Sequence, residues 1–341
     1  MLAPLPPWQP SSLSHDLQPG NAPEGHPESS FLDRSKPHRD YTLIFVGDVM
    51  LARRVGATMQ ARHDWVYPFR KIAETLRAAD IAYCNLECPI SDRGRDRHHL
   101  YSFRADPQAL EGLSAAGFDV VSQANNHSFD WGPEALSDSL QRLEKRGIRA
   151  VGAGGNDLAA HYPLLVNLGG LRVAFLAYVE VAPEQAAAGD NRPGVAWLEP
   201  ERVLADIRFA RPLADLVIVC PHWGVEYAVR PRRDQVELAH RMIDAGADLV
   251  VGSHPHVVQP LESYHGRWIA YSLGNFVFDQ KPPATRRGLM LRVRVRGRQI
   301  AQVTPVSIRI NSGFQAVLDA SQTQKRITLL THEGSLAQQA W

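Results

Sequence analysis

Six short polar segments carry the residue types that bind metals and transfer protons. They contain Asp, Glu, Asn and His side chains, and each segment stands where a run of apolar residues ends. The segments are Gly47-Asp48, Asn85-Leu86-Glu87, Asn125–Asp130, His222-Trp223-Gly224, Gly252–His256 and Gly274-Asn275. Carboxylate, amide and imidazole groups from separate strand ends are typical ligands of Mn, Fe, Zn or Mg. The sequence therefore predicts a site for one or two divalent metal ions along one edge of a sheet.

The spacing within two of these segments supports this interpretation. His254-Pro255-His256 carries two imidazoles two residues apart, so both face the same side of an extended segment. Asp130 follows His127 by three residues, which suits a carboxylate that orients the imidazole ring. Asn is also a common turn residue, so Asn126 has a second interpretation that needs no metal.

Composition and charge exclude several classes of protein. The 341 residues carry a formal net charge of +1, so the chain lacks the basic field with which proteins bind nucleic acid. Its apolar runs are shorter than the roughly 20 residues of a transmembrane helix, and Met1–Trp8 lacks the pattern of a secretory signal. We therefore expect a cytoplasmic protein. Cys84, Cys88 and Cys220 cannot all pair internally, and we expect buried free thiols.

The apolar pattern predicts the elements that position the polar segments. Short apolar runs predict strands, and apolar spacings of three and four residues predict helices between them. The expected strands cover residues 41–46, 81–84, 118–122, 148–151, 164–168, 171–179, 216–219, 249–251, 259–264, 267–272, 288–296 and 299–310. The expected helices cover residues 68–79, 107–116, 133–146, 201–210 and 233–245. Strands that first alternate with helices and then form hairpins predict an α/β fold of the four-layer α/β/β/α sandwich type.

The chain divides into three regions of different character. Residues 1–39 are rich in Pro and Ser and have little periodic apolar content, so we expect a disordered arm. Residues 40–312 contain all the predicted elements and form the expected folded domain. Residues 313–341 are polar and weakly patterned, and no element is predicted there. Within residues 288–296, arginines alternate with apolar residues, which predicts a strand with one solvated or helix-covered face.

The order of the six segments resembles that of the CapA family of capsule-synthesis proteins, which belongs to the calcineurin-like metallophosphatases. The resemblance runs from about Tyr41 to about Ile310. It implies a sandwich of the metallophosphatase type with a metal site at the strand ends. The implied metal ligands are Asp48, Glu87, Asn126, His222, His254 and His256.

The resemblance also implies a role for each side chain of the site. Glu87 resembles a carboxylate that bridges two metal ions, and Asp48 and His256 resemble ligands of the first ion. The remaining three ligands resemble those of the second ion. His127 resembles the imidazole that stabilises or protonates a leaving group, with Asp130 to orient it. The expected catalytic residues are therefore His127, Asp130 and Asp48.

One position departs from the family pattern, and three others stand at the rim. Typical metallophosphatases have a His two residues after the first Asp, and this chain has Met50 there. A thioether is a poor ligand for Mn or Mg, so we expect Met50 to face the site and the first metal site to be weak or empty. We expect Asn275, Trp223 and Glu226 to bind substrate, with core packing as the alternative for Trp223.

Three functions are consistent with these observations. The first is a metal-dependent hydrolase or ligase-accessory enzyme for an anionic polymer or phosphoester. The resemblance implies a role in poly-γ-glutamate capsule synthesis, together with capsule-synthesis proteins. The second is a metal-free or single-metal acid/base enzyme that epimerises a peptide Cα between Asp48 and a histidine. The third is a non-catalytic binding or scaffold protein. Relatives in the family are commonly anchored at the membrane and face outward, unlike the location expected here.

Overall fold

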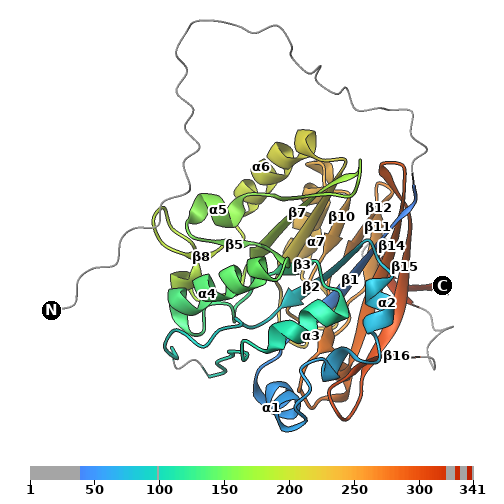
Figure 1. The fold of residues 1–341 in the computed structure, drawn as a ribbon. Coiled ribbons are helices and arrows are strands. Elements are labelled where there is room, and N and C mark those ends of the chain that lie inside the picture. The colour runs from blue at the N-terminus through green and yellow to red at the C-terminus, as the bar shows by residue number, and fades with distance from the viewer. Residues whose placement is uncertain (1–38, 98–99, 320–326, 331–335, 340–341) are drawn as a thin grey trace, which may run out of the picture. The chain divides into compact units, whose positions relative to one another are not determined.

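The structure is a computed structural model that describes residues 39–97, 100–319, 327–330 and 336–339 (Figure 1). The expected arm, residues 1–39, lies outside the described residues apart from Arg39. The described residues belong to one compact unit. Two eight-stranded sheets form the centre of this unit, and a two-stranded ribbon lies beside them.

The first sheet joins parallel strands to an antiparallel side. Its order is β16-β15-β14-β1-β2-β3-β4, and β13 also pairs with β1. The strands β1 to β4 and β13 are parallel, whereas β14, β15 and β16 pair in antiparallel fashion. The strands are β1 (Tyr41–Val49), β2 (Ile81–Leu86), β3 (Val120–Ser122), β4 (Arg149–Val151), β13 (Asn275–Val277), β14 (Arg287–Arg296), β15 (Gln299–Ile310) and β16 (Ala316–Leu318).

The second sheet has the order β18-β17-β11-β12-β10-β9-β7-β6. Its strands are β6 (Leu164–Asn167), β7 (Arg172–Val179), β9 (Leu216–His222), β10 (Leu249–Val251), β11 (Leu261–Tyr264), β12 (Arg267–Ala270), β17 (Ile327–Leu330) and β18 (Leu336–Gln339). The small ribbon pairs β5 (Ala153–Gly154) with β8 (Gly194–Val195). The strands β7, β9 and β10 are parallel, so their carboxyl ends meet at one edge of this sheet.

Three apolar clusters separate four layers of structure. The cluster between the sheets brings Tyr83 of β2 against Phe175 of β7, with stacked rings whose centroids are 6.2 Å apart. A second cluster joins the other face of the first sheet to helices through residues such as Val55 and Leu113. A third joins the second sheet to helices through residues such as Met242. These contacts confirm the predicted four-layer α/β/β/α sandwich.

The helices form the two outer layers and the connections between strands. Figure 1 shows α2 and α3 in front of the strands of the first sheet. The helices are α1 (Arg53–Ala61), α2 (Ala73–Arg77), α3 (Ala109–Ala116), α4 (Gly132–Lys145), α5 (Asp157–His161), α6 (Pro200–Ala210) and α7 (Arg233–Asp244). Short 3-10 turns cover Tyr67–Phe69, Glu184–Ala186, Arg211–Leu213 and Pro283–Arg286.

Most of the predicted elements are present, and three regions differ. The expected helix over residues 68–79 is interrupted: a 3-10 turn over Tyr67–Phe69 precedes α2. The helix α1 was not predicted, and three residues separate it from the end of β1. It also predicted no element after residue 312, where β16, β17 and β18 add strands to both sheets. Arg292, Arg294 and Arg296 of β14 are exposed, which confirms that this strand has one solvated face.

Strand register places the polar segments side by side. Asp48 of β1 pairs with Asn85 of β2 on one side and with Asn275 of β13 on the other. In the second sheet, His222 at the end of β9 forms a bridge with Ser253. These strand ends therefore supply one group of polar side chains from each sheet.

The close approach of two strands at this edge depends on a glycine. The backbone N–H of Asp48 donates a 3.0 Å hydrogen bond to the carbonyl of Gly274. A Cβ atom at Gly47 would lie only 1.8 Å from that carbonyl oxygen. A side chain at Gly47 would therefore push β1 away from the segment that leads into β13.

Candidate metal centre

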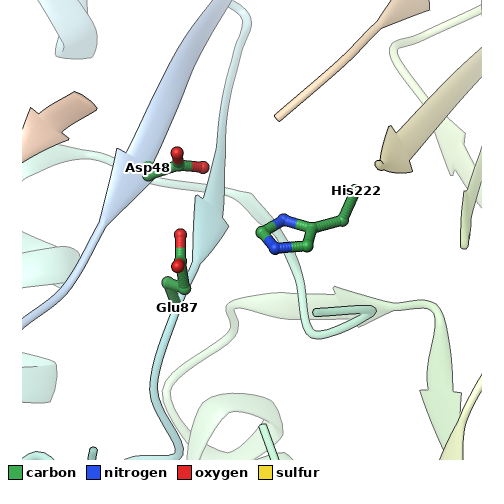
Figure 2. Close-up of side chains that lie close together, drawn as sticks. All are labelled: Asp48, Glu87 and His222. Carbon is green, nitrogen blue, oxygen red and sulfur yellow. The ribbon is translucent and has the colours of Figure 1, made fainter. Parts of the chain in front are cut away.

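Three buried side chains from both sheets form a cluster that suits a metal ion. Asp48 lies in β1, Glu87 directly follows β2, and His222 ends β9. Each side chain offers one ligand atom, and these three atoms all lie within 4.8 Å of one another. Figure 2 shows the two carboxylates and the imidazole pointing toward a common space between the strands.

Asn85 lies at the centre of this cluster, although it was not among the predicted ligands. Its Nδ2 lies 2.9 Å from Asp48 Oδ1, 3.2 Å from Glu87 Oε2 and 3.3 Å from His222 Nδ1. The amide of Asn125 donates to Asn85 Oδ1 at 3.1 Å, which fixes the orientation of the Asn85 amide. One donor therefore connects three candidate ligands. The sequence signal for Asn85 is its place two residues before Glu87, on the same face of the strand.

The imidazole of His222 is held at both ring nitrogens. Its Nε2 lies 2.8 Å from Asn126 Oδ1 and its Nδ1 lies 2.9 Å from Ser253 Oγ. The ring centroid of His254 lies 4.9 Å from that of His222. Burial, reinforced by neighbouring histidines, lowers the pKa of His222 well below its usual value and that of His254 to about 3. Both rings are therefore neutral at neutral pH, which is the form that binds metals.

His256 approaches the two carboxylates from the opposite side. Its Nδ1 lies 3.2 Å from Asp48 Oδ2 and 3.0 Å from Asn275 Oδ1, and its Nε2 lies 3.6 Å from Glu87 Oε1. The backbone φ angles of His254 and His256 are 97° and 59°, in a region that non-glycine residues seldom adopt. Such strain is concentrated at functional sites because the surrounding structure enforces it.

The electrostatics of the cluster favour a bound cation. Glu87 is fully buried, and burial together with the nearby Asp48 raises its pKa well above the usual value. Among the described residues, Glu87 Oε1 and Asp48 Oδ2 are buried and accept no hydrogen bond, because the nearby His256 nitrogens lack hydrogen-bond geometry. The buried Nδ1 of His254 likewise has no hydrogen-bond partner in this part of the chain. Unpartnered buried oxygens of this kind fit a divalent metal bound between the two carboxylates.

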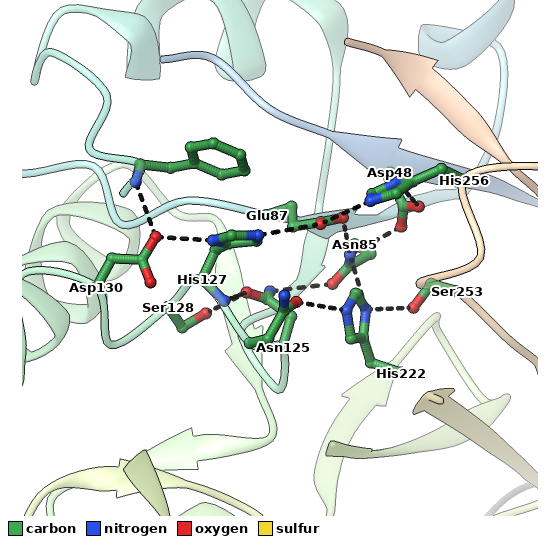
Figure 3. A network of polar contacts seen from close by, with 12 residues as sticks. Asp48, Asn85, Glu87, Asn125, His127, Ser128, Asp130, His222, Ser253 and His256 are labelled. Atoms are coloured by element: carbon green, nitrogen blue, oxygen red, sulfur yellow. Dashed lines mark hydrogen bonds and ion pairs between the residues drawn. The ribbon is translucent and has the colours of Figure 1, made fainter. Parts of the chain in front are cut away.

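A second group of residues lies next to the cluster and is suited to proton transfer. The Nδ1 of His127 lies 2.7 Å from Asp130 Oδ2, as predicted from their spacing, and that carboxylate also accepts a hydrogen bond from Phe103 N at 2.8 Å. Phe103 stacks on the His127 ring, with centroids 3.9 Å apart. Figure 3 shows Nε2 of His127 directed toward Glu87, and the distance to Oε1 is 4.0 Å. The carboxylate therefore fixes one nitrogen of the ring and leaves the other facing the cluster.

A cavity of about 410 Å³ opens beside the cluster. His127 and His256 line it together with Glu226, which is the predicted rim residue that the structure places there. The cavity lies within the range of about 300–1,000 Å³ that is typical of small-ligand sites. The sequence analysis did not single out Arg53 or Asp279, which also line this cavity.

Two of the residues expected to bind substrate have other positions. Trp223 is 1% exposed and packs in the apolar cluster between the second sheet and its helices, where its Nε1 donates to Tyr271 O at 3.0 Å. Asn275 is fully buried, and its amide nitrogen donates to Gln280 Oε1 and Thr285 O while its oxygen faces His256. These positions favour the core-packing alternative for Trp223, and substrate binding by Asn275 stays a prediction. Trp223 is a core residue, and Asn275 positions the His256 ring.

Met50 does not face the cluster as expected. Its side chain is fully buried in the apolar cluster beneath the first sheet, and its Sδ lies 3.1 Å from Ala52 N. The pairing of β1 with β13 shifts register between Asp48 and Val49. Such an irregularity breaks the alternation of side chains on which the expectation depended. Within the described residues, the site therefore lacks both the usual His and any thioether in its place.

Two further expectations concern the cysteines and the membrane. Cys84, Cys88 and Cys220 are free and buried, as predicted. Burial raises the pKa of Cys88 to about 12, and its Sγ accepts a hydrogen bond from Leu51 N at 3.5 Å. Within the part of the chain that the structure describes, no helix has the length and apolar character needed to cross a bilayer.

Comparison with known proteins identifies the family. Residues 42–280 match the model of the bacterial capsule synthesis protein PGA_cap. The chain is 32% identical over 315 residues to the capsule biosynthesis protein CapA of Bacillus anthracis, covering 89% of this chain and 76% of that protein. It is 33% identical over 302 residues to the PGA biosynthesis protein CapA of Bacillus subtilis, covering 86% and 78%.

Solved structures with a similar fold are more distant in sequence. One is a phosphatase from Mycoplasma pneumoniae, with 13% identity, a TM-score of 0.49 and coverage of 80% of this chain and 94% of that one. Another is the NAD nucleotidase NadN of Haemophilus influenzae, with 12% identity, a TM-score of 0.48 and coverage of 89% and 54%. The family match over residues 42–280 and the two CapA relatives show that this chain belongs to the PGA_cap family of bacterial capsule synthesis proteins.

Proposed function

We propose that this protein is a metal-dependent hydrolase-type enzyme that acts on an anionic polymer during capsule synthesis. The observation that carries the proposal is the buried cluster of Asp48, Glu87 and His222, whose ligand atoms lie within 4.8 Å of one another. Two unpartnered carboxylate oxygens in that cluster need a cation or a proton to be stable in a buried site. Poly-γ-glutamate is the proposed polymer, in line with the name of the Bacillus subtilis relative.

The residues present fit one or two divalent ions. The proposed ligands are the three residues of this cluster and the three predicted residues that surround it, namely Asn126, His254 and His256. A divalent ion bound there supplies Lewis-acid polarisation of a phosphoryl or carbonyl oxygen. Asn85 has a different part, because its amide donates toward three ligand residues and holds them in place.

His127 is the proposed acid/base residue. Its Nδ1 is hydrogen-bonded to Asp130, so the carboxylate orients the ring. Its Nε2 faces the cluster and the cavity, where it can hold a proton for a leaving group or take one from an attacking water. The stacked Phe103 keeps the ring in this orientation.

Acid/base chemistry without a metal pair is the second candidate. Two observations favour it: Met50 replaces one imidazole of the first ligand set and lies in an apolar cluster, and the Asn85 amide already bridges three ligands. In this case Asp48 and a histidine on the other side of the substrate are the proposed proton-transfer groups for a peptide Cα. Capsule-synthesis proteins are the proposed partners in both cases. A scaffold role without chemistry is the remaining alternative.

Metal content decides between these functions. Purified protein is dialysed against EDTA, titrated with Mn in a calorimeter and assayed with a chromogenic phosphodiester, next to an Asp48→Asn variant. We expect one or two bound equivalents, Mn-dependent turnover in wild type, and the loss of both in the variant. Turnover that persists without metal would favour the acid/base enzyme instead. The absence of both metal binding and turnover would overturn the proposal and leave the scaffold role.

A further inference from the structure

Arg53 is an unusual residue in the wall of the cavity beside the candidate metal centre. It is the first residue of α1, and its backbone φ is 48°. A non-glycine residue seldom adopts this left-handed conformation, and the surrounding structure must enforce it. The side chain is 31% exposed and lines the same cavity as His127 and His256. The fold therefore directs a cation into this cavity at a cost in backbone strain.

A buried carboxylate holds one edge of the Arg53 guanidinium. Arg53 Nε donates to Asp279 Oδ2 at 3.2 Å, and Nη2 forms an ion pair with Asp279 Oδ1. The Asp279 side chain is 3% exposed, and it also accepts a hydrogen bond from Arg54 N. Asp279 therefore holds the guanidinium of Arg53 in place. This contact fixes the direction in which the opposite edge of the guanidinium points.

Aromatic rings connect Arg53 to the histidines of the site. The guanidinium carbon lies 4.8 Å from the ring centroid of Phe103 and 5.9 Å from that of Phe278. Phe103 also stacks on His127 at 3.9 Å, and Phe278 packs edge to face on His256 at 4.9 Å. The same two rings therefore hold the guanidinium and both histidines, so the cation sits at a fixed offset from the reacting centre.

The other edge of the guanidinium has donors to spare. Arginine carries five N–H groups in a planar fork, and the contacts to Asp279 occupy two of them. Within the described residues, Nη1 of Arg53 donates no hydrogen bond. An edge with two parallel N–H groups matches an oxyanion in bidentate fashion. Arg54 and Lys281 also line the cavity and add positive charge to it.

We propose that Arg53 binds an oxyanion of the substrate and thereby sets which substrates reach the metal centre. The shared chemistry is a carboxylate or a phosphate placed beside the reacting bond. The inference rests on the proposed function for its substrate, and it adds the residue that recognises the negative charge. A purely structural role is the alternative, in which the ion pair with Asp279 only anchors α1.

The test compares anionic and neutral ligands in two variants. Arg53→Lys keeps the charge and loses the planar fork, and Arg62→Lys is the matched control because Arg62 also lies over a ring, that of Tyr67, outside the cavity. The probes are triglutamate, phenyl phosphate and triglutamine blocked at both ends as its uncharged N-acetyl amide. We expect Arg53→Lys to weaken triglutamate binding about tenfold, with triglutamine binding unchanged and Arg62→Lys equal to wild type. A loss confined to phenyl phosphate would instead assign the oxyanion as phosphate.

Three results would overturn the inference. The first is that Arg53→Lys binds triglutamate and phenyl phosphate as tightly as wild type does. The others are that the variant loses triglutamine affinity to the same extent as anion affinity, or that wild type binds neither anion. Each titration is run in EDTA and again with Mn, so that failure of the metal proposal is seen separately from failure at Arg53. If the Arg53→Lys variant does not fold, a chemical-modification experiment on wild type alone still tests the inference. Triglutamate or phenyl phosphate, but not triglutamine, should slow phenylglyoxal modification of Arg53, mapped by mass spectrometry with Arg62 as the internal reference. Unprotected modification of Arg53 counts against the inference.

Discussion

Replacing Glu87 by Gln should change the stability of this protein in opposite directions with and without metal. Glu87 is fully buried beside Asp48, and its pKa is raised by burial first and by the Asp48 charge second. Without metal, this arrangement destabilises the fold once both carboxylates are ionised. With metal bound, the same two carboxylates become ligands. Without metal, Glu87→Gln therefore removes a destabilising charge repulsion. With metal bound, it removes a ligand.

The expected size of each effect follows from the geometry. Ligand atoms of Asp48 and Glu87 lie within 4.8 Å of each other, so two full charges at that distance repel by about 3 kcal/mol at an effective dielectric constant of about 20. Glu87→Gln should therefore raise the free energy of unfolding of the metal-free protein by about 3 kcal/mol when both groups are ionised. Mn at a hundred times its Kd should stabilise wild type by about 2.7 kcal/mol, and the variant should gain much less.

The pH dependence has a definite sign. Because the folded-state pKa of Glu87 is raised, its contribution to stability is fully present below about pH 4.3 and is lost as the pH rises toward the folded-state pKa. Within that window the loss approaches about 1.4 kcal/mol per pH unit for one group. The lowered pKa of His254 acts in the opposite direction, since its contribution is lost as the pH falls below about 6.5. His254 is present in both proteins, so the difference between them isolates Glu87.

Urea unfolding of both proteins from pH 5 to pH 8, in EDTA and in Mn, measures these quantities. Glu144→Gln is the control, because that exposed carboxylate lies in α4 and does not line the cavity. We expect the variant to be the more stable protein in EDTA and the less stable one in Mn. If Glu87→Gln destabilises the protein equally in both conditions, Glu87 has a structural role and the argument for a cation site is wrong.

Three further predictions follow from the buried positions. Met50→His should destabilise the protein by about 1–3 kcal/mol without increasing Mn stoichiometry in calorimetry, because Met50 lies in an apolar cluster. Asp130→Asn should lower kcat by about 10²–10⁴ with unchanged Mn affinity, because Asp130 orients His127; an unchanged rate would remove His127 as the acid/base residue. Trp223→Phe should lower the free energy of unfolding by about 1–3 kcal/mol, since Tyr271 O loses its donor, and a raised KM at unchanged stability would contradict the core position of Trp223.

Much of the architecture was predictable from local patterns. A short run of apolar residues that is buried on both faces usually forms a strand in the middle of a sandwich. The strand β10 was therefore predicted with its observed ends, Leu249–Val251. The helix α4 was predicted within one residue at each end, because Pro133 suits the first turn and Gly147, with φ of 75°, follows the last. The weak pattern after residue 312 was not predictable, because β16 depends on pairing with β15 rather than on its own sequence.

The candidate site was only partly predictable. The sequence identified the ligand types, because carboxylates and imidazoles at strand ends are the usual metal ligands. It missed Asn85, whose amide was expected neither to bind metal nor to act on substrate. It also missed the pairing of Arg53 with Asp279, two residues 226 positions apart that meet near the adjacent strands β1 and β13. No local pattern reports a contact over that separation.

The sequence by itself determined which side chains stand at the ends of strands, because burial dictates where apolar runs begin and end. The tertiary structure decided which way several of those side chains point. A register shift after Asp48 turned Met50 into the apolar cluster, and packing against Tyr271 turned Trp223 away from the cavity. Direction depends on which strand lies beside which and on small shifts in their pairing, and these are properties of the assembled sheets rather than of any one segment.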